Sequence, residues 1–299
     1  MIISKIQGGL GNQMFQYAFG LSQATRLNSE LKIEIDNFDS PEEYRNFELN
    51  LFNISAKKVE QEDLDSLGIP SLSSKKIIPK IRRGLLKKHE LNLPIEEKTI
   101  VIENGFAFDS TTSKITDGTI LVGNWQSEKY FKQIRDRIVK EFSIKNPSAI
   151  FKKFQEVIIK NLDLSISVHV RRGDYANNPK YNAKHGVLPI EYYSKSVELI
   201  REKIPNAIFY IFSDDIPWVK ENLSFIKPVI FVSDNGTNNA EDIILMSLCR
   251  YHIIANSSFS WWGAWLDPKK DKTVIAPKQW FVTNNDTTDD LIPKEWLRM

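Results

Sequence analysis

Short apolar runs alternate with helix-like segments along this sequence, and several of the runs end in glycine or polar clusters. The first unit of the pattern is a strand expected over 2–6, a glycine-rich loop "QGGLGNQ" and a helix from about Met14. Strand-like "SISVHVR" (165–171) and "AIFYIFS" (207–213) repeat it further along. Such alternation predicts an α/β protein with mainly parallel sheets. Ligands of these folds bind beyond the carboxyl ends of the strands, where the polar clusters lie.

The stretch "LSISVHVRRGDYANN" (164–178) joins an apolar strand to a charged exit. Alternation divides its side chains between two faces, with Ile166, Val168 and Val170 on one and Ser167, His169 and Arg171 on the other. Gly173 permits a sharp turn, which places Asp174 just beyond the strand end. The pattern fits either a surface strand with a solvated ion pair or a strand that delivers polar groups to a ligand.

The amino-terminal glycines partly match a dinucleotide-binding fingerprint. Gly9 and Gly11 would be its first two glycines, and Asp36, after the strand "LKIEI", its ribose ligand. Met14 stands where the third glycine would permit close helix–strand packing, which weighs against a nicotinamide or flavin site. A tight turn without a ligand stays open, although the loop and Asn12 offer backbone N–H groups that an anion or sugar could approach.

A third polar cluster lies in "NSSFSWWGAWL" (256–266). Ser257 and Ser258 stand where a short helix would begin, so their hydroxyls can cap it while its amino end faces an anion such as phosphate. The tryptophans that follow, Trp261, Trp262 and Trp265, are expected in the core.

Composition excludes several classes of protein. At 299 residues the chain is long for one domain, and its net charge of +2 argues against electrostatic binding of nucleic acid. Cys249 is the only cysteine, which excludes an internal disulfide and fits a reducing compartment. Four scattered histidines are too few for a structural zinc site. The adjacent aspartates of "SDD" (213–215) would point to opposite sides of an extended backbone, which disfavours a metal site.

No apolar run approaches the length of a membrane span, and the start lacks the apolar core of a signal peptide. We therefore expect a soluble cytoplasmic protein. The basic segment 75–91 fits a solvated lobe, or a peripheral contact with the inner face of the membrane.

Four motifs in this order resemble the bacterial α-1,2-fucosyltransferases, glycosyltransferase family 11: "GGLGNQMFQYAFG", "VHVRRGDY", "FSDD" and "NSSFSWWGAWL". The resemblance spans nearly the whole chain, and "LVGNWQSEKYF" (121–131) adds to it, although Asn124 and Trp125 replace a more usual Tyr-Phe pair. It implies a GT-B architecture, in which two Rossmann-like domains face a central cleft. We expect residues 1–146 on the acceptor side and residues 147–299 to bind the donor.

The resemblance further implies an inverting transfer of L-fucose from GDP-β-L-fucose to the 2-hydroxyl of a galactose residue, in an oligosaccharide or an O-antigen repeat, without a metal or other cofactor. Arg171 and His169 would serve the pyrophosphate, and Asp174 is the candidate base. Asp242 would accept the guanine hydrogens. The remaining donor contacts would be Gly9, Leu10, Gly11, Asn12, Ser257, Ser258 and Phe259.

The residues leave other points open. Arg172, on the opposite strand face from Arg171, is expected to hold structure by pairing with Asp174, which could instead only orient an arginine. Trp125 is a candidate for stacking on the acceptor sugar. An α-1,6-fucosyltransferase, or a nucleotide-sugar or glycan-binding protein without turnover, would share the same motifs.

Overall fold

The computed structural model describes residues 1–39, 45–68, 93–282 and 288–299. It divides the chain into two compact units, Met1–Asn50 with Ile54–Glu141 (unit 1) and Leu51–Asn53 with Phe142–Met299 (unit 2). The basic segment 75–91 lies outside the described residues. Within the described ranges no helix has both the length and the apolar character needed to cross a membrane.

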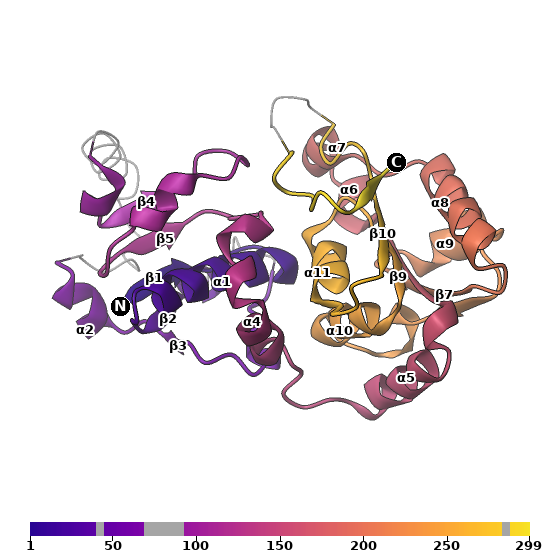
Figure 1. Ribbon diagram of the computed structural model, residues 1–299, viewed down its shortest axis with the longest axis horizontal. Helices are drawn as coiled ribbons and strands as arrows, with labels where there is room; N and C mark the ends of the chain where they lie inside the picture. Colours follow the sequence, from indigo (N-terminus) through magenta and orange to yellow (C-terminus); the bar gives the residue numbers. More distant parts are fainter. Residues whose placement is uncertain (40–44, 69–92, 283–287) are drawn as a thin grey trace. The chain divides into compact units, whose positions relative to one another are not determined.

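Unit 1 is built on a parallel sheet of five short strands in the order β3-β2-β1-β5-β4 (Figure 1). Its strands are β1 (Ile2–Lys5), β2 (Leu31–Glu34), β3 (Lys57–Lys58), β4 (Ile100–Ile102) and β5 (Ile120–Val122). Its helices include α1 (Leu10–Arg26), α2 (Gln61–Ser66) and α4 (Arg135–Glu141).

Helix α1 packs on β1 and β2, and almost every residue from Leu10 to Ala24 is buried, as the apolar sequence predicts. The close helix–strand contact is at Gly20, where an added Cβ would lie 2.8 Å from Leu31 Cδ1 and 2.9 Å from Ser4 Cβ. The dinucleotide fingerprint requires its third glycine at position 14, where this chain has Met14. The glycine that lets α1 approach the sheet is instead Gly20.

Unit 2 contains a parallel sheet of six strands in the order β11-β10-β9-β6-β7-β8. Its strands are β6 (Ser165–Val170), β7 (Ile208–Ser213), β8 (Val229–Phe231), β9 (Tyr251–Ile253), β10 (Thr273–Ala276) and β11 (Leu297–Arg298). Its helices are α5 (Ala149–Lys160), α6 (Gly173–Asn177), α7 (Pro179–His185), α8 (Ile190–Lys203), α9 (Ile216–Asn222), α10 (Asn239–Leu248) and α11 (Ser258–Leu266).

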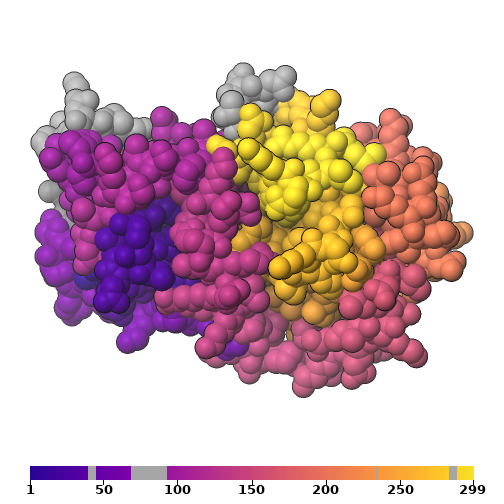
Figure 2. Space-filling view, in the orientation of Figure 1, coloured from indigo at the N-terminus to yellow at the C-terminus, as the bar shows by residue number. Residues whose placement is uncertain are grey.

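The helices of unit 2 cover both faces of this sheet, with α8 and α9 on one side and α10 and α11 on the other (Figure 1). Atoms of the carboxyl-terminal residues 288–299, yellow in Figure 2, lie on the face of unit 2 that this view shows. Strands covered on both faces read as apolar runs, which explains the apolar sequence of β7.

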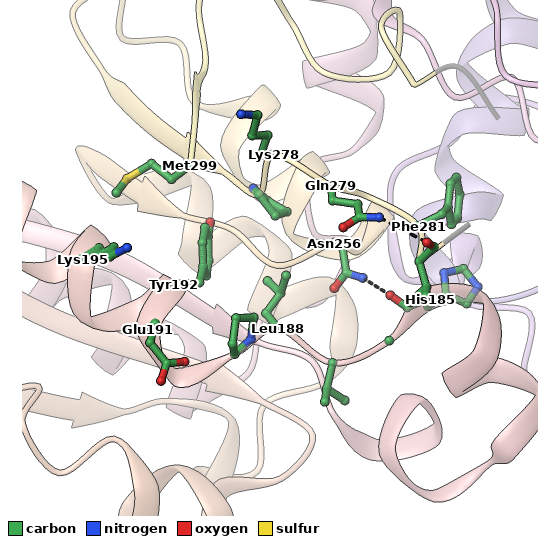
Figure 3. A pocket seen from close by; sticks show the side chains of 15 residues that line it. His185, Leu188, Glu191, Tyr192, Lys195, Asn256, Lys278, Gln279, Phe281 and Met299 are labelled. Atoms are coloured by element: carbon green, nitrogen blue, oxygen red, sulfur yellow. Dashed lines mark hydrogen bonds between the residues drawn. The ribbon is translucent and has the colours of Figure 1, made fainter. Parts of the chain in front are cut away.

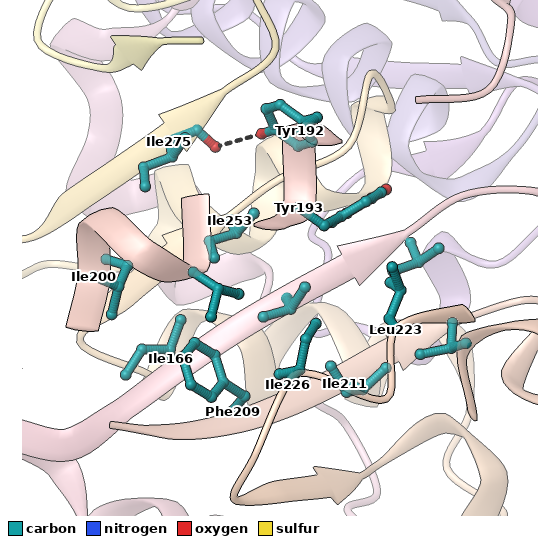
Figure 4. Packing of buried hydrophobic residues seen from close by; sticks show 14 of the residues in the cluster. Ile166, Tyr192, Tyr193, Ile200, Phe209, Ile211, Leu223, Ile226, Ile253 and Ile275 are labelled. Carbon is teal, nitrogen blue, oxygen red and sulfur yellow. Dashed lines mark hydrogen bonds between the residues drawn. The ribbon is translucent and has the colours of Figure 1, made fainter. Parts of the chain in front are cut away.

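The core under α8 and α9 contains the three residues of β6 that alternation assigned to a buried face (Figure 4). Ile166, Val168 and Val170 pack there with Tyr193 and Phe209, and all are essentially inaccessible to water. Each such side chain stabilises the fold by about 1.5–3 kcal/mol. Burial of this face fixes the orientation of β6, so Ser167, His169 and Arg171 must point to the other side of the strand.

Candidate functional site

The polar clusters of unit 2 gather where its parallel strands end. Arg171 follows β6, Asp214 and Asp215 follow β7, and Ser257 lies between β9 and α11. Because the carboxyl ends of parallel strands lie at one edge of a sheet, these groups share that edge, as the sequence predicts.

Arg171 is held between two carboxylates. Its Nη2 lies 2.5 Å from Asp174 Oδ1, and its Nη1 lies 2.8 Å from Asp214 Oδ2. The guanidinium carbon also lies 5.2 Å from the centre of the Tyr175 ring. The second oxygen of Asp214 accepts the backbone N–H of Arg172 at 2.8 Å. These contacts fix both the turn after β6 and the plane of the guanidinium.

Arg172 points to a different set of partners. Its Nε lies 3.2 Å from Asp215 Oδ2, and its guanidinium carbon lies 3.9 Å from the centre of the Trp218 ring. Asp174, which the sequence analysis paired with Arg172, pairs with Arg171. The two aspartates after β7 point to different arginines, in agreement with the alternation argument. Asp215 also caps α9 by accepting the N–H of Trp218 at 3.2 Å.

Gly173 makes the contact of Asp214 with Arg171 possible. A Cβ at this position would lie 2.4 Å from Asp214 Oδ2, closer than atoms can approach. The sequence assigns Gly173 to a turn, and the structure adds that its missing side chain makes room for a carboxylate.

His169 lies on β6, buried, with its ring centre 5.4 Å from that of Phe259. Burial, together with the charge of Arg171, lowers the pKa of His169 to about 3. The ring is therefore neutral near pH 7, and its Nδ1 is buried without a hydrogen-bond partner. A neutral imidazole of this kind can hydrogen-bond a ligand, but it is a weak base.

Helix α11 begins as the sequence predicts, with Ser257 as its N-cap. The Ser257 hydroxyl accepts the N–H of Phe259 at 3.3 Å, while Ser258 and Phe259 stay partly exposed. The three tryptophans of this helix are buried and anchor it in unit 2. The amino end of α11 thus presents backbone dipoles and hydroxyls at the same sheet edge as Arg171.

Asp242 is buried on α10, where two hydroxyl groups bind its carboxylate. Ser233 Oγ donates to Oδ2 at 2.5 Å, and Thr237 Oγ1 donates to Oδ1 at 2.5 Å. Burial nevertheless raises the pKa of Asp242 to about 6. Each carboxylate oxygen keeps a second lone pair that can accept a hydrogen bond.

The predicted glycine loop of unit 1 is shorter than expected, because α1 begins at Leu10 instead of about Met14. Gly9 is the N-cap and has no side chain to close the first turn. Leu10 and Gly11 are buried in that turn, whereas Gly9 and Asn12 keep partial exposure. The Asn12 side chain accepts a hydrogen bond from Gln126 Nε2 at 2.8 Å.

Trp125, the candidate acceptor contact, is only 1% exposed. Its ring packs against Phe19 at 4.2 Å and against Tyr130 at 5.5 Å between ring centres, so it offers no open face to a sugar in this structure. Its backbone adopts the left-handed region with φ of 55°. The Glu103 carboxylate stabilises that turn by accepting the N–H groups of Asn124 at 2.5 Å and Trp125 at 2.8 Å.

Two residues were missed by the sequence analysis. Glu103 is a single acidic residue after β4, and no motif in the sequence marks it. Only the structure shows that it is buried and that burial raises its pKa. Asp214 was discussed in the sequence analysis only as a disfavoured metal ligand, and its pairing with Arg171 was not foreseen. Among the described residues, no group of three or more His, Cys, Asp or Glu side chains is placed to hold a metal ion.

The sequence model of glycosyl transferase family 11 matches residues 1–299. The chain is 33% identical over 308 aligned residues to an α-1,2-colitosyltransferase of Escherichia coli, with 100% of this chain and 99% of that protein covered. It is 32% identical to the O-antigen biosynthesis glycosyltransferase WbnK of Escherichia coli, with 99% of each covered.

Among solved structures, the fucosyltransferase NodZ from Bradyrhizobium superposes with a TM-score of 0.52 at 16% identity, covering 89% of this chain and 92% of that one. At that identity the likeness concerns the fold alone, and it confirms the expected α/β GT-B class. The match over the full length and the identity to the two bacterial enzymes decide the family: this chain is a member of glycosyl transferase family 11.

Proposed function

We propose that this protein is an inverting α-1,2-fucosyltransferase that uses GDP-β-L-fucose and acts on the 2-hydroxyl of a galactose residue. The observation that carries the proposal is Arg171, fixed by two carboxylates beside the neutral His169 and the amino end of α11. Of its five N–H groups, these ion pairs engage one on each Nη. The remaining donors suit the oxygens of a diphosphate.

This arrangement suits the departure of a nucleoside diphosphate. In an inverting transfer the acceptor oxygen bonds to the anomeric carbon as the bond from that carbon to the β-phosphate oxygen breaks. Negative charge then grows on the β-phosphate, and a preorganised guanidinium stabilises it without reorientation. Ser257, Ser258 and Phe259 at the start of α11 would hold the same diphosphate. Asp242 would accept guanine N–H groups.

The acceptor proton needs a base, and we propose Asp174 for this role because it is the motif carboxylate that lies at the sheet edge where Arg171 is held. On this proposal Asp214 alone keeps Arg171 in place when Asp174 turns to the 2-hydroxyl. From unit 1, Gly9, Leu10, Gly11 and Asn12 would contribute contacts to the donor.

Two relationships support the substrate assignment. NodZ, an α-1,6-fucosyltransferase, has been crystallised with GDP and soaked with GDP-fucose, which supports a GDP-sugar as the donor here. WbnK is named for O-antigen biosynthesis, which favours a polysaccharide repeat as the acceptor. We also propose that the enzyme works at the cytoplasmic face, where GDP-sugars are made.

A second donor is favoured by the 33% identity to an α-1,2-colitosyltransferase. Colitose is fucose without its 3-hydroxyl, so the two donors differ at one position of the sugar. Turnover with GDP-fucose and with GDP-colitose on the same galactoside, followed by linkage analysis of the product, decides between them. A 1→6 linkage, or donor hydrolysis without transfer, would reject the proposal.

The role of Arg171 is tested with a matched pair of variants. Arg171→Lys keeps the charge but loses the planar fork, so we expect kcat to fall about 10²–10³-fold, or about 3–4 kcal/mol. Arg172→Lys is the control, because Arg172 contacts Asp215 and Trp218 and should affect thermal stability instead. Loss of turnover in Arg172→Lys with a near-normal Arg171→Lys would show that the wrong arginine has been assigned.

A further inference from the structure

Gln126, which is 114 residues from Asn12 in the chain, binds the side chain of that residue in the first turn of α1. Its Nε2 donates to Asn12 Oδ1 at 2.8 Å, and Gln126 itself is buried. The N-cap of the helix, Gly9, has no side chain that could hold this turn from within. The hydrogen bond from Gln126 therefore fixes the Asn12 side chain, which keeps partial exposure at the amino end of α1.

The amino end of α11 in unit 2 is held in a comparable way. Asn256 is buried and directly precedes Ser257, the N-cap of α11. Its Nδ2 donates to the carbonyl oxygens of His185 at 2.8 Å and Trp280 at 3.2 Å. Figure 3 shows the bond to His185, in the lining of a pocket of about 380 Å³. Both helix ends that are proposed to meet the donor are thus tied to a distant segment by the amide of one buried side chain.

Glu103 in turn fixes the backbone that carries Gln126. One carboxylate oxygen accepts the N–H of Asn124 at 2.5 Å, and the other accepts the N–H of Trp125 at 2.8 Å. Gly123 leaves room for the acid, because a Cβ at that position would lie 2.3 Å from Glu103 Cβ. Burial raises the pKa of Glu103 even though both N–H groups favour its charged form, so the carboxylate is held here at an energetic cost.

The turn that Glu103 stabilises is strained. Trp125 has φ of 55°, in the left-handed region that residues with a Cβ rarely adopt. Its carbonyl oxygen accepts the N–H of Ser127 at 2.8 Å, which makes Gln126 the central residue of a three-residue turn. Strained backbone persists where surrounding contacts fix it, and it clusters at functional sites. Here those contacts orient Gln126, whose side chain reaches Asn12.

We propose that Glu103 and Gln126 are positioning residues for the donor site: Glu103 fixes the turn 123–125, and Gln126 holds the Asn12 side chain where it meets the donor. The inference rests on the proposed function for the role of Asn12 as a donor contact. Neither positioning residue needs to touch the donor. Because a binding contact of this kind acts equally in the ground state and the transition state, its loss raises KM and leaves kcat unchanged.

The first test removes the hydrogen bond to Asn12. Gln126→Leu keeps the size of the side chain but has no donor, so we expect KM for GDP-fucose to rise about 10-fold, or about 1.4 kcal/mol, with kcat near wild type. Gln133→Leu is the matched control, because Gln133 Nε2 donates to Ser22 Oγ at 2.6 Å, further along the same helix. An unchanged KM in Gln126→Leu, or an equal rise in the control, would overturn the inference.

The second test is a double-mutant cycle on the Kd of GDP-fucose, measured by calorimetry without acceptor. If Gln126 acts through Asn12, Gln126→Leu should weaken binding by less than about 2-fold in the Asn12→Ala background. Glu103→Gln should weaken binding in the wild-type background, since its amide nitrogen would face a backbone N–H. That effect should also disappear in the Asn12→Ala background. Effects that multiply with the effect of Asn12→Ala would show that neither residue acts through Asn12.

The same variants separate this inference from the proposed function. Weaker donor binding in Asn12→Ala, with normal binding in Gln126→Leu and Glu103→Gln, would overturn the positioning role and leave the donor contact standing. Normal binding in Asn12→Ala would reject the donor contact and this inference with it. A cycle that behaves as expected, in a protein that transfers no fucose to any galactoside, would keep the positioning role and reject the proposed transfer.

Discussion

Gly8 and Gly9, at the amino end of α1, are neighbours with different physical roles. Gly8 has φ of 75°, a conformation that strains any residue with a Cβ. Gly9 has φ of −72°, and a Cβ added there would meet nothing within 4 Å. The fold therefore requires glycine at position 8 but not at position 9. We infer that the open space at Gly9 serves a bound molecule, and the proposed donor is the candidate.

Alanine at each position should separate these roles. Gly9→Ala should change the free energy of unfolding by less than about 1 kcal/mol, while KM for GDP-fucose rises about 10-fold. Gly8→Ala should cost about 1–2 kcal/mol of stability through its backbone. Urea unfolding and initial rates on both variants provide the check. Normal kinetics in Gly9→Ala would mean that the space beside it is empty during catalysis.

At the residue scale, the motif positions could be predicted but several of their partners could not. The sequence pointed to Arg171, yet it paired Asp174 with Arg172 and did not identify Asp214 as a partner of Arg171. Pairing depends on the register of β6 with β7, in which Val170 lies opposite Ser213 and so brings Arg171 beside Asp214. Strand register across 40 residues follows from packing of the whole sheet, which local patterns do not encode.

At the scale of elements, a buried polar chain joins β6, β9 and the end of α11. Ser167 Oγ lies 2.8 Å from His252 Nδ1, and His252 Nε2 lies 3.1 Å from Asp267 Oδ2. These are the residue types of a hydrolytic triad, but their exposed fractions are 2%, 0% and 1%, so a substrate cannot reach them. These hydrogen bonds instead connect β6, the strand before Arg171, with β9 and with the carboxyl end of α11.

Removing the middle of this chain should be costly. His252→Leu leaves the Ser167 hydroxyl and one oxygen of Asp267 buried without His252 as a partner, so we expect a loss of about 3–5 kcal/mol. Ser167→Ala is the milder comparison and should cost about 1 kcal/mol, since only one neutral hydrogen bond is removed. Chemical denaturation measures both. Equal midpoints for His252→Leu and wild type would show that the chain contributes nothing to stability.

Element type could be predicted from local sequence more closely than element ends. The expected strand over 165–171 ends at Val170, and α11 begins at the predicted serines. Helix α1 begins four residues earlier than Met14, because Gly9 can serve as an N-cap and the first turn tolerates Gly11 and Asn12. Glycine and asparagine are poor helix formers, so the sequence of the first turn of α1 predicts a loop instead of a helix.

At the scale of the whole molecule, alternation of strands and helices predicted parallel sheets, while chain length and the family resemblance predicted two units. The boundary was harder, because the predicted division between 146 and 147 treats the chain as linear. In the structure residues 51–53 belong to unit 2, where Phe52 pairs with Ile144 and Leu51 O accepts the N–H of Lys145. A contact between segments about 90 residues apart has no local signature.

The dependence of the unfolding free energy on acid pH involves buried titratable groups of both units. Burial lowers the pKa of His169 to about 3 and of His185 to about 4, and it also lowers the pKa of His252. In the unfolded chain each titrates near 6.5, so below that pH the unfolded state binds protons that the folded state does not. Stability from these groups is therefore complete above about pH 6.5 and falls as the pH decreases.

Two buried carboxyls oppose this trend. The pKa of Asp242 is raised to about 6, and burial also raises that of Glu103, so the folded state takes up these protons at higher pH than the unfolded state. The contribution of Asp242 to stability increases as the pH falls through about 6, and that of Glu103 also increases as the pH falls through its raised pKa. Because three histidines outnumber two carboxyls, we expect wild-type stability to be highest near pH 7 and to decline between pH 6.5 and 5, with each group changing the slope by at most about 1.4 kcal/mol per pH unit.

Asp242→Asn isolates one of the opposing groups. The variant cannot take up the proton, so its acid decline between pH 6 and 4 should be steeper than that of wild type, by up to about 1.4 kcal/mol per pH unit. The comparison uses slopes of unfolding free energy against pH, and therefore does not depend on any constant loss from the altered bonds to Ser233 and Thr237. Parallel slopes for the two proteins would show that Asp242 has the same pKa in the folded and unfolded states. That result would contradict the raised pKa expected from its burial.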